Sequence, residues 1–143
     1  VKDRDNESRG LNFLGNVERL EKNYANAIKF YNDSLEISRS ISNKNTESNS
    51  LSNLGLIAEM QNDKVKALDY FTQAAKIYRN NLENSRLYAQ TLYHQARMKR
   101  ELGQLQSAAE DIKEAVSEVE KLRERIPSQT LRSSFFASIQ QYY

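Results

Sequence analysis

The sequence repeats itself with a period of roughly 40 residues, and this feature constrains the fold more than any other. Two columns of small residues share the same two steps along the chain: Gly15, Gly55 and Ala96, and twelve positions later Ala27, Ala67 and Ala108. Self-similarity at a fixed period of this length is typical of architectures that stack one supersecondary unit on the next. We therefore expect three structural repeats.

The apolar spacing predicts two antiparallel helices in each repeat. Apolar residues recur at steps of three and four, for example at Ala67, Leu68, Phe71, Ala74, Ala75 and Tyr78, as on one face of an α-helix. The expected first helices cover 7–21, 46–61 and 86–102. The expected second helices cover 24–42, 64–83 and 105–125.

Small residues in the middle of the first helices require a reason, because glycine is about 1 kcal/mol less favourable than alanine there. We expect the paired helix to approach closely, with Ala27, Ala67 or Ala108 at the crossing. The turns within the repeats are marked by Asn23, Asp63 and Gly103. The expected N-caps of the second and third repeats are Asn45 and either Asn84 or Ser85.

Composition supports an all-helical chain. Of the 143 residues, 38% are hydrophobic and 28% charged, and one Pro and four Gly supply little turn chemistry. A sandwich or barrel with many tight turns is therefore excluded. Thirteen aromatic residues, 8 Tyr and 5 Phe, argue against disorder. These proportions fit a chain with a small hydrophobic core and solvent-exposed helix faces.

The same counts exclude several kinds of site. There is no Cys, which removes disulfides, thiolate zinc sites and cysteine nucleophiles, and the one His removes a multi-histidine metal site. A net charge of +2 points to neither nucleic acid nor an anionic membrane as the partner. No apolar run approaches a membrane span and no signal peptide opens the chain. We expect a cytoplasmic protein without cofactors and, since it begins at Val1, a piece of a longer one.

Two segments bear on the domain boundaries. The stretch 38–52 is rich in Ser and Asn; it is either a flexible linker or a helix end, a short turn and the next helix start, and the apolar phase at Ile41 and Leu51 favours the second. After Pro127, Ser128 opens an expected last helix within the segment 127–143, and the apolar face of this helix would cover the exposed flank of the third repeat. The domains are thus 1–126, with repeats at about 7–44, 45–84 and 85–126, and a C-terminal cap or connector.

The repeats resemble the tetratricopeptide repeat (TPR). That family's pattern of a small residue, Ala, an aromatic residue and a second small residue is present at the following positions: Gly15, Ala27, Tyr31 and Ser34; Gly55, Ala67, Phe71 and Ala74; and, with Ile in the aromatic position, Ala96, Ala108, Ile112 and Ala115. The third repeat also has Gln95 where the family prefers an apolar residue. The period is longer than that of the plain TPR and is similar to that of the long repeats of kinesin light chains. The resemblance implies an all-α, right-handed α-solenoid of three antiparallel helix pairs plus a C-terminal capping helix.

The tail resembles the segment that follows TPR arrays in bacterial, often cyanobacterial, CHAT-domain proteins. There an L-R-x-S-[FY]-F-A-S-x-Q-x-Y-Y run precedes a caspase-like domain, and here that run covers 131–143. The resemblance implies a regulatory or recruiting region of a larger protease-like protein, in contact with a downstream caspase-like domain. No catalytic residue of that family falls within the chain.

The concave groove of such a solenoid is lined by the first helices and binds peptides or partner helices. The predicted groove residues are Asn12, Asn16, Arg19, Ser52, Leu56, Glu59, Tyr93, Arg97 and Arg100. Three arginines against one acid suit an acidic or C-terminal peptide, because a guanidinium donates two parallel hydrogen bonds to a carboxylate. A solvated helix face is the plainer interpretation. Asn12 and Asn16 reproduce at most part of the carboxylate clamp of chaperone-binding TPRs.

Two other functions stay open as alternatives to a non-catalytic protein-binding scaffold. A hydrolase would have to rely on His94, which has no sequence-evident catalytic partner. A helical-repeat nucleic-acid binder would need a basic stripe through all repeats, and the second repeat has Glu59 in that place. Acids between Glu110 and Glu120 are explained by helical pairing at i,i+3 and i,i+4 rather than by a metal.

Overall fold

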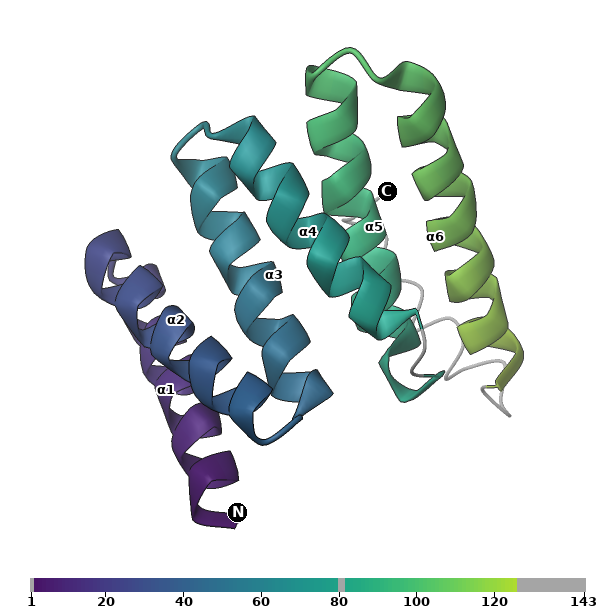
Figure 1. The fold of residues 1–143 in the computed structure, drawn as a ribbon. Helices are drawn as coiled ribbons and strands as arrows, with labels where there is room; N and C mark the ends of the chain where they lie inside the picture. Colours follow the sequence, from purple (N-terminus) through teal and green to yellow (C-terminus); the bar gives the residue numbers. More distant parts are fainter. Residues whose placement is uncertain (1, 80–81, 126–143) are drawn as a thin grey trace. The chain divides into compact units, whose positions relative to one another are not determined.

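The computed structural model describes residues 2–79 and 82–125, and these form six α-helices and one short 3-10 helix (Figure 1). The helices are α1 (Lys2–Leu20), α2 (Tyr24–Ser40), α3 (Lys44–Met60), α4 (Lys64–Tyr78), α5 (Ser85–Glu101) and α6 (Leu105–Arg125), with η1 at Leu82–Asn84. The described residues contain no strand. The all-α class and the three helix pairs predicted from the repeats are confirmed. The expected capping helix over 127–143 lies outside the described residues.

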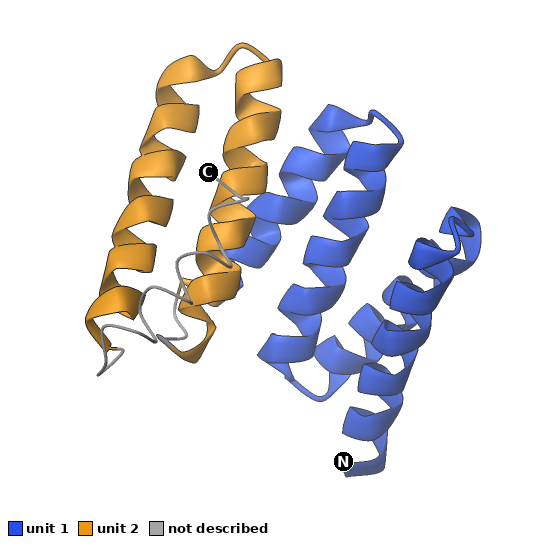
Figure 2. Cartoon of the chain, turned by 180° about the vertical axis from the view of Figure 1, so that it is seen from behind, with its two compact units in different colours: residues 1–77 blue, residues 78–143 orange. Residues whose placement is uncertain are grey.

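The chain divides into two compact units, residues 1–77 and 78–143 (Figure 2). Unit 1 holds the first helix pair, α1 and α2, and the second pair, α3 and α4 up to Ile77. In it α2 packs on α1, and α3 packs on both. Unit 2 holds the third pair, in which α5 packs on α6.

Helix ends depart from prediction at three places. Helix α1 begins at Lys2, earlier than the expected residue 7, because Asp3 and Asp5 favour a helix N-terminus. Helix α4 ends at Tyr78 instead of 83, before two asparagines of low helix propensity. The N-cap of α3 is Asn43, not Asn45, and its side chain accepts the Thr46 N–H at 3.0 Å.

The Ser- and Asn-rich stretch is a helix end, a turn and a helix start, as the apolar phase predicted. The turn has a left-handed residue, Ser42, with φ 57°. Its N–H bonds the Arg39 carbonyl at 3.1 Å, and the Asn43 N–H bonds the Ser38 carbonyl at 2.8 Å. This pair of bonds is a Schellman motif, which satisfies the last carbonyls of α2. Lys22, Asn62 and Gly103 adopt the same backbone conformation after α1, α3 and α5.

Buried serines connect neighbouring helices in the core of unit 1. Ser8, Ser34 and Ser50 are fully buried and come from three different helices. Ser34 Oγ bonds the Ser8 carbonyl at 2.7 Å, and the Ser34 and Ser50 hydroxyls are 3.0 Å apart. Small side chains at these points let the helices approach, while each hydroxyl keeps a partner, as buried polar groups require.

The glycines of the first helices permit a close approach of the paired helix, as predicted. A Cβ on Gly15 would lie 2.6 Å from Tyr31 Cε1, and one on Gly55 would lie 2.7 Å from Phe71 Cε1. The nearest neighbour of each glycine is therefore an aromatic ring of the paired helix. The aromatic ring occupies the space that a side chain at the glycine would need.

Candidate functional site

In the first helix pair, the predicted groove residues serve helix packing. Asn12 donates to Ser50 Oγ at 2.8 Å, and Asn53 of α3 donates to Asn12 Oδ1 at 3.4 Å. Asn16 Oδ1 accepts the Tyr31 hydroxyl at 2.8 Å. These side chains bind their neighbouring helices, which leaves them less capacity for a ligand.

Arg19 lies beside the same phenol. Burial raises the pKa of Tyr31 above its ordinary value, and neighbouring Arg19 opposes this effect. The Arg19 Nε is itself buried and has no hydrogen-bond partner among the described residues. Its side chain is half-buried, so its charge is only partly available at the surface.

In the second helix pair, the predicted residues are Ser52, Leu56 and Glu59. Their spacing of four and three residues places them on one face of α3, and all three are half-buried.

In the third helix pair, the predicted residues come together. Tyr93, Arg97 and Arg100 of α5 line a pocket of about 330 Å³, whose remaining lining is Ala96, Leu105, Ala108, Ala109 and Ile112. The Arg97 guanidinium carbon lies 5.9 Å from the Tyr93 ring centroid, within cation–π range. The His94 ring meets Tyr93 edge-on at 5.8 Å. The tyrosine ring thus orients one of the two arginines.

A change of residue type at two repeat positions opens this pocket. Where the first two pairs combine a glycine with Tyr31 or Phe71, the third combines Ala96 with Ile112. Tyr31 and Phe71 are almost fully buried against their glycines. The aliphatic Ile112 does not extend as far as a ring, so space remains between α5 and α6.

The pocket combines an apolar floor with two guanidiniums. Its floor is alanine, leucine and isoleucine, and its charged groups are Arg97 and Arg100. An apolar surface with guanidiniums at its edge suits a ligand that has both an apolar part and a carboxylate. The floor residues from α6 were not among the predicted site residues; the missing ring in the column of Tyr31 and Phe71 was the signal for them.

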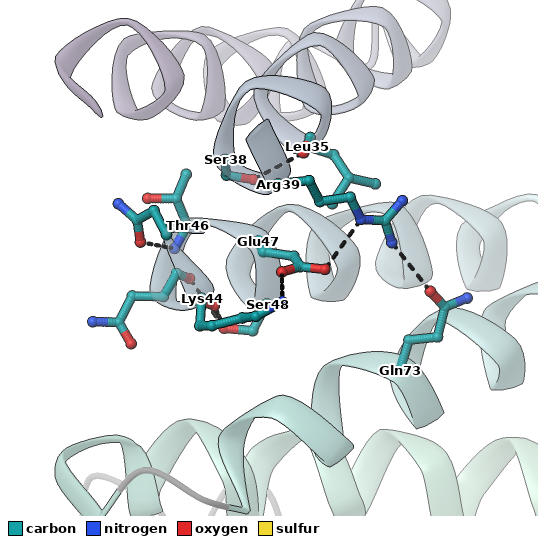
Figure 3. A network of polar contacts seen from close by, with 10 residues as sticks. Leu35, Ser38, Arg39, Lys44, Thr46, Glu47, Ser48 and Gln73 are labelled. Carbon is teal, nitrogen blue, oxygen red and sulfur yellow. Dashed lines mark hydrogen bonds and ion pairs between the residues drawn. The ribbon is translucent and has the colours of Figure 1, made fainter. Parts of the chain in front are cut away.

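Polar networks elsewhere have structural roles. In unit 1, Glu47 is 6% exposed and accepts Arg39 Nε at 3.0 Å and Lys44 Nζ at 2.6 Å, while Arg39 also reaches Gln73 of α4 (Figure 3). Burial would raise the pKa of Glu47, but these hydrogen bonds outweigh it and lower the pKa. The network ties α2, α3 and α4 together.

Unit 2 has two such networks. Glu114 accepts Arg79 at 2.8 Å and the Tyr88 hydroxyl at 2.6 Å. Burial, with Glu114, raises the pKa of Tyr88 to about 12. Lys99 Nζ lies 2.7 Å from Asp111 Oδ2, with side chains only 14% and 11% exposed.

The acids of α6 are explained only in part by pairing along the helix. Glu118 and Glu120 pair with Lys121 and Arg123 at i,i+3, as predicted, but Asp111 and Glu114 bind residues outside α6. Among residues 2–79 and 82–125, no cluster of His, Asp and Glu could hold a metal ion. No helix in that part of the chain is long and apolar enough to cross a membrane.

Comparison with known proteins identifies the family. A search of the curated proteins found no match. The tetratricopeptide repeat model matches residues 7–80, just over half of the chain. TPR repeats are generally non-catalytic modules for protein–protein interaction. With this match and its paired helices, the chain belongs to the tetratricopeptide repeat family.

Proposed function

We propose that the chain is a non-catalytic scaffold that binds an acidic protein segment, with the unit 2 pocket as the contact site. The observation that carries this proposal is the gathering of Tyr93, Arg97 and Arg100 around one apolar pocket. Arginine and tyrosine are enriched where binding energy concentrates. A carboxylate of the partner pairs with the guanidiniums, and an apolar group enters the pocket.

The six remaining predicted groove residues have a smaller part in this proposal. In the first pair, Asn12 and Asn16 already bond neighbouring helices. Ser52, Leu56 and Glu59 offer one acid and no cation. We therefore expect them to contribute surface rather than charge recognition.

The test uses a fluorescein-labelled octapeptide of Ala and Glu with a free C-terminal carboxylate, and its C-terminal amide as a second probe. Fluorescence anisotropy should show binding that weakens with salt, since the contact is electrostatic. The variant Arg97→Glu/Arg100→Glu should lose binding at least tenfold. A matched control, Arg86→Glu/Lys113→Glu, makes the same change in net charge at exposed positions of α5 and α6 outside the pocket lining and should retain it.

Four possible results distinguish between the candidate functions and sites. Equal loss in both variants would reduce the effect to net charge, and unchanged binding in the pocket variant would move the site elsewhere. Weaker binding of the amide alone would assign the pocket to a chain terminus. Salt-sensitive binding of a single-stranded RNA, with none of the peptides, would favour the nucleic-acid alternative.

We further propose that the scaffold is the regulatory or recruiting part of a larger, bacterial CHAT protease-like protein in the cytoplasm. The support is the run Leu131, Arg132, Ser134, Phe135, Phe136, Ala137, Ser138, Gln140, Tyr142 and Tyr143. A caspase-like domain should follow it in the gene and should contact the scaffold. A gene whose next segment has no such domain would refute this part alone.

A further inference from the structure

The outer face of α1 is apolar and exposed. Phe13 is 67% exposed, Leu14 46%, Val17 37% and Leu20 74%, and their spacing of three and four residues places them on one side of the helix. Gly10 is exposed on the same side, and a Cβ at this residue would meet nothing within 4 Å. Glycine is disfavoured in the middle of a helix, and no described neighbour of Gly10 needs its small size. These are the properties of a helix-packing surface.

The next repeat shows the same apolar pattern in a packed state. One repeat after Leu14 and Val17 stand Leu54 and Ile57 of α3, which are 2% and 1% exposed. Helix α3 packs on α2 and α1. The pattern that helix packing covers in α3 is therefore exposed in α1.

Two further positions of the α1 face match the contact between α3 and α2. Glu47 of α3 accepts Arg39 Nε of α2 at 3.0 Å, and Figure 3 shows this ion pair between the two helices. Glu7 stands one repeat before Glu47 and is exposed. Gly10 keeps a small residue at the position of Ser50, which bonds α2. The α1 face therefore suits a helix that has a basic residue where α2 has Arg39.

The side chains that join α3 to α1 have no equivalent on the α1 face. Ser50 of α3 accepts a hydrogen bond from Asn12, and Asn53 of α3 donates one to the same residue. Their counterparts one repeat earlier are Gly10 and Phe13, whose side chains form no hydrogen bonds. The face thus fits a single helix like α2 better than a complete helix pair like α1 and α2.

We infer that this face binds one amphipathic helix of a partner protein, through Glu7, Gly10, Phe13, Leu14, Val17 and Leu20. The partner helix carries the α2 pattern of a small residue, an apolar residue and a basic residue beyond them, as Ser34, Leu35 and Arg39 stand in α2. The small residue lies against Gly10, and the basic residue pairs with Glu7. This contact is separate from the unit 2 pocket and does not rest on the acidic-segment proposal.

A second copy of this chain does not offer such a helix. The side of α2 that carries Arg39 is already packed against α3. At the corresponding repeat positions, Arg79 already pairs with Glu114, and α6 has Glu120. Glu120 would meet Glu7 as a like charge, which disfavours association.

The test uses a fluorescein-labelled peptide with the α2 sequence, residues 24–40, and the same peptide with Arg39→Glu. Fluorescence anisotropy with the full chain should show saturable binding of the first peptide. Val17→Asp in the chain should weaken this binding about tenfold. The matched control Val65→Asp makes the same change at an α4 residue that is 68% exposed and should retain it. The Arg39→Glu peptide should bind wild type more weakly, and Glu7→Arg in the chain should restore its binding.

Circular dichroism verifies the fold of each variant, and the charge exchange between Glu7 and Arg39 tests the face even if Val17→Asp fails to fold. Equal binding by both aspartate variants, or no rescue by Glu7→Arg, would overturn the proposal. A dimer of the chain that Val17→Asp dissociates would assign the face to a second copy and would also overturn it. So would an upstream segment of the gene that encodes a helix of this pattern, since that helix would cover α1 within one protein. The acidic peptide takes no part in this assay, so failure here leaves the acidic-segment proposal standing, and loss of acidic-peptide binding leaves this one standing.

Discussion

The two glycines of α1 should respond in opposite directions to the same substitution. Gly10 and Gly15 lie in one helix, where alanine is favoured over glycine by about 1 kcal/mol. A Cβ on Gly10 meets nothing within 4 Å. Gly10→Ala should therefore raise the free energy of unfolding by about 0.5–1 kcal/mol.

At Gly15 the added carbon would lie 2.6, 2.7 and 3.0 Å from three atoms of the Tyr31 ring. The ring is fully buried and its hydroxyl is bonded to Asn16, so it has nowhere to move. Overpacking of a core typically costs about 1–3 kcal/mol, which exceeds the propensity gain. Gly15→Ala should therefore lower stability by up to about 2 kcal/mol net.

Urea unfolding followed by circular dichroism measures both differences in one series. At this chain length, 1 kcal/mol corresponds to about 4 °C in Tm, so thermal unfolding separates the two variants by several degrees. Gly55→Ala should repeat the loss, since Phe71 Cε1 would be 2.7 Å away. A stabilising or neutral effect at Gly15, equal to that at Gly10, would refute the ring–glycine argument.

Three further outcomes follow from the structure. Lys99→Met leaves the buried Asp111 carboxylate without its cation and should lower the free energy of unfolding by about 3 kcal/mol at pH 7. Burial raises the pKa of Asp111, so the folded state holds the proton of this carboxyl more tightly. The loss should therefore shrink on acidification, as measured by urea unfolding at several pH values. The pKa of Glu47 is lowered instead, so its contribution is present above about pH 4.3 and is lost as the pH falls through the folded pKa; the Tm difference between wild type and Glu47→Gln should shrink between pH 6 and pH 3. Ser42→Gly relieves a left-handed backbone and should raise Tm by about 2–4 °C, whereas Gly103→Ala, at φ 79°, should lower it.

The fold was largely predictable from the sequence because a repeat reports the same structure three times. The columns of small residues fixed the phase of every helix, and most observed helix ends lie close to the predicted ones. Local chemistry was less decisive at the α3 cap. Asn43 and Asn45 are both good N-caps, and only the Schellman turn at Ser42 determines that Asn43 takes the position.

The structure brings only some of the predicted site residues together, for a physical reason. A polar side chain on an expected groove face has the same sequence pattern whether it faces water or a neighbouring helix. Asn12 bonds Ser50, 38 residues away, a contact set by the offset between helices rather than by the period along one helix. The arginines of α5 border a pocket formed within one helix pair, so their predicted role in binding stays a proposal.

The exchange of an aromatic ring for an aliphatic residue accounts for the pocket in the third pair. A glycine and an aromatic ring pack together without open space, because the ring occupies the space that the missing Cβ provides. An alanine beside Ile112 keeps the helices together, with Ala108 only 7% exposed, but leaves about 330 Å³ open. The substitution that weakens the match of this repeat to its family thus lies at the open space of this helix pair. A departure from a repeat pattern, more than the pattern itself, indicates where such an array leaves open space.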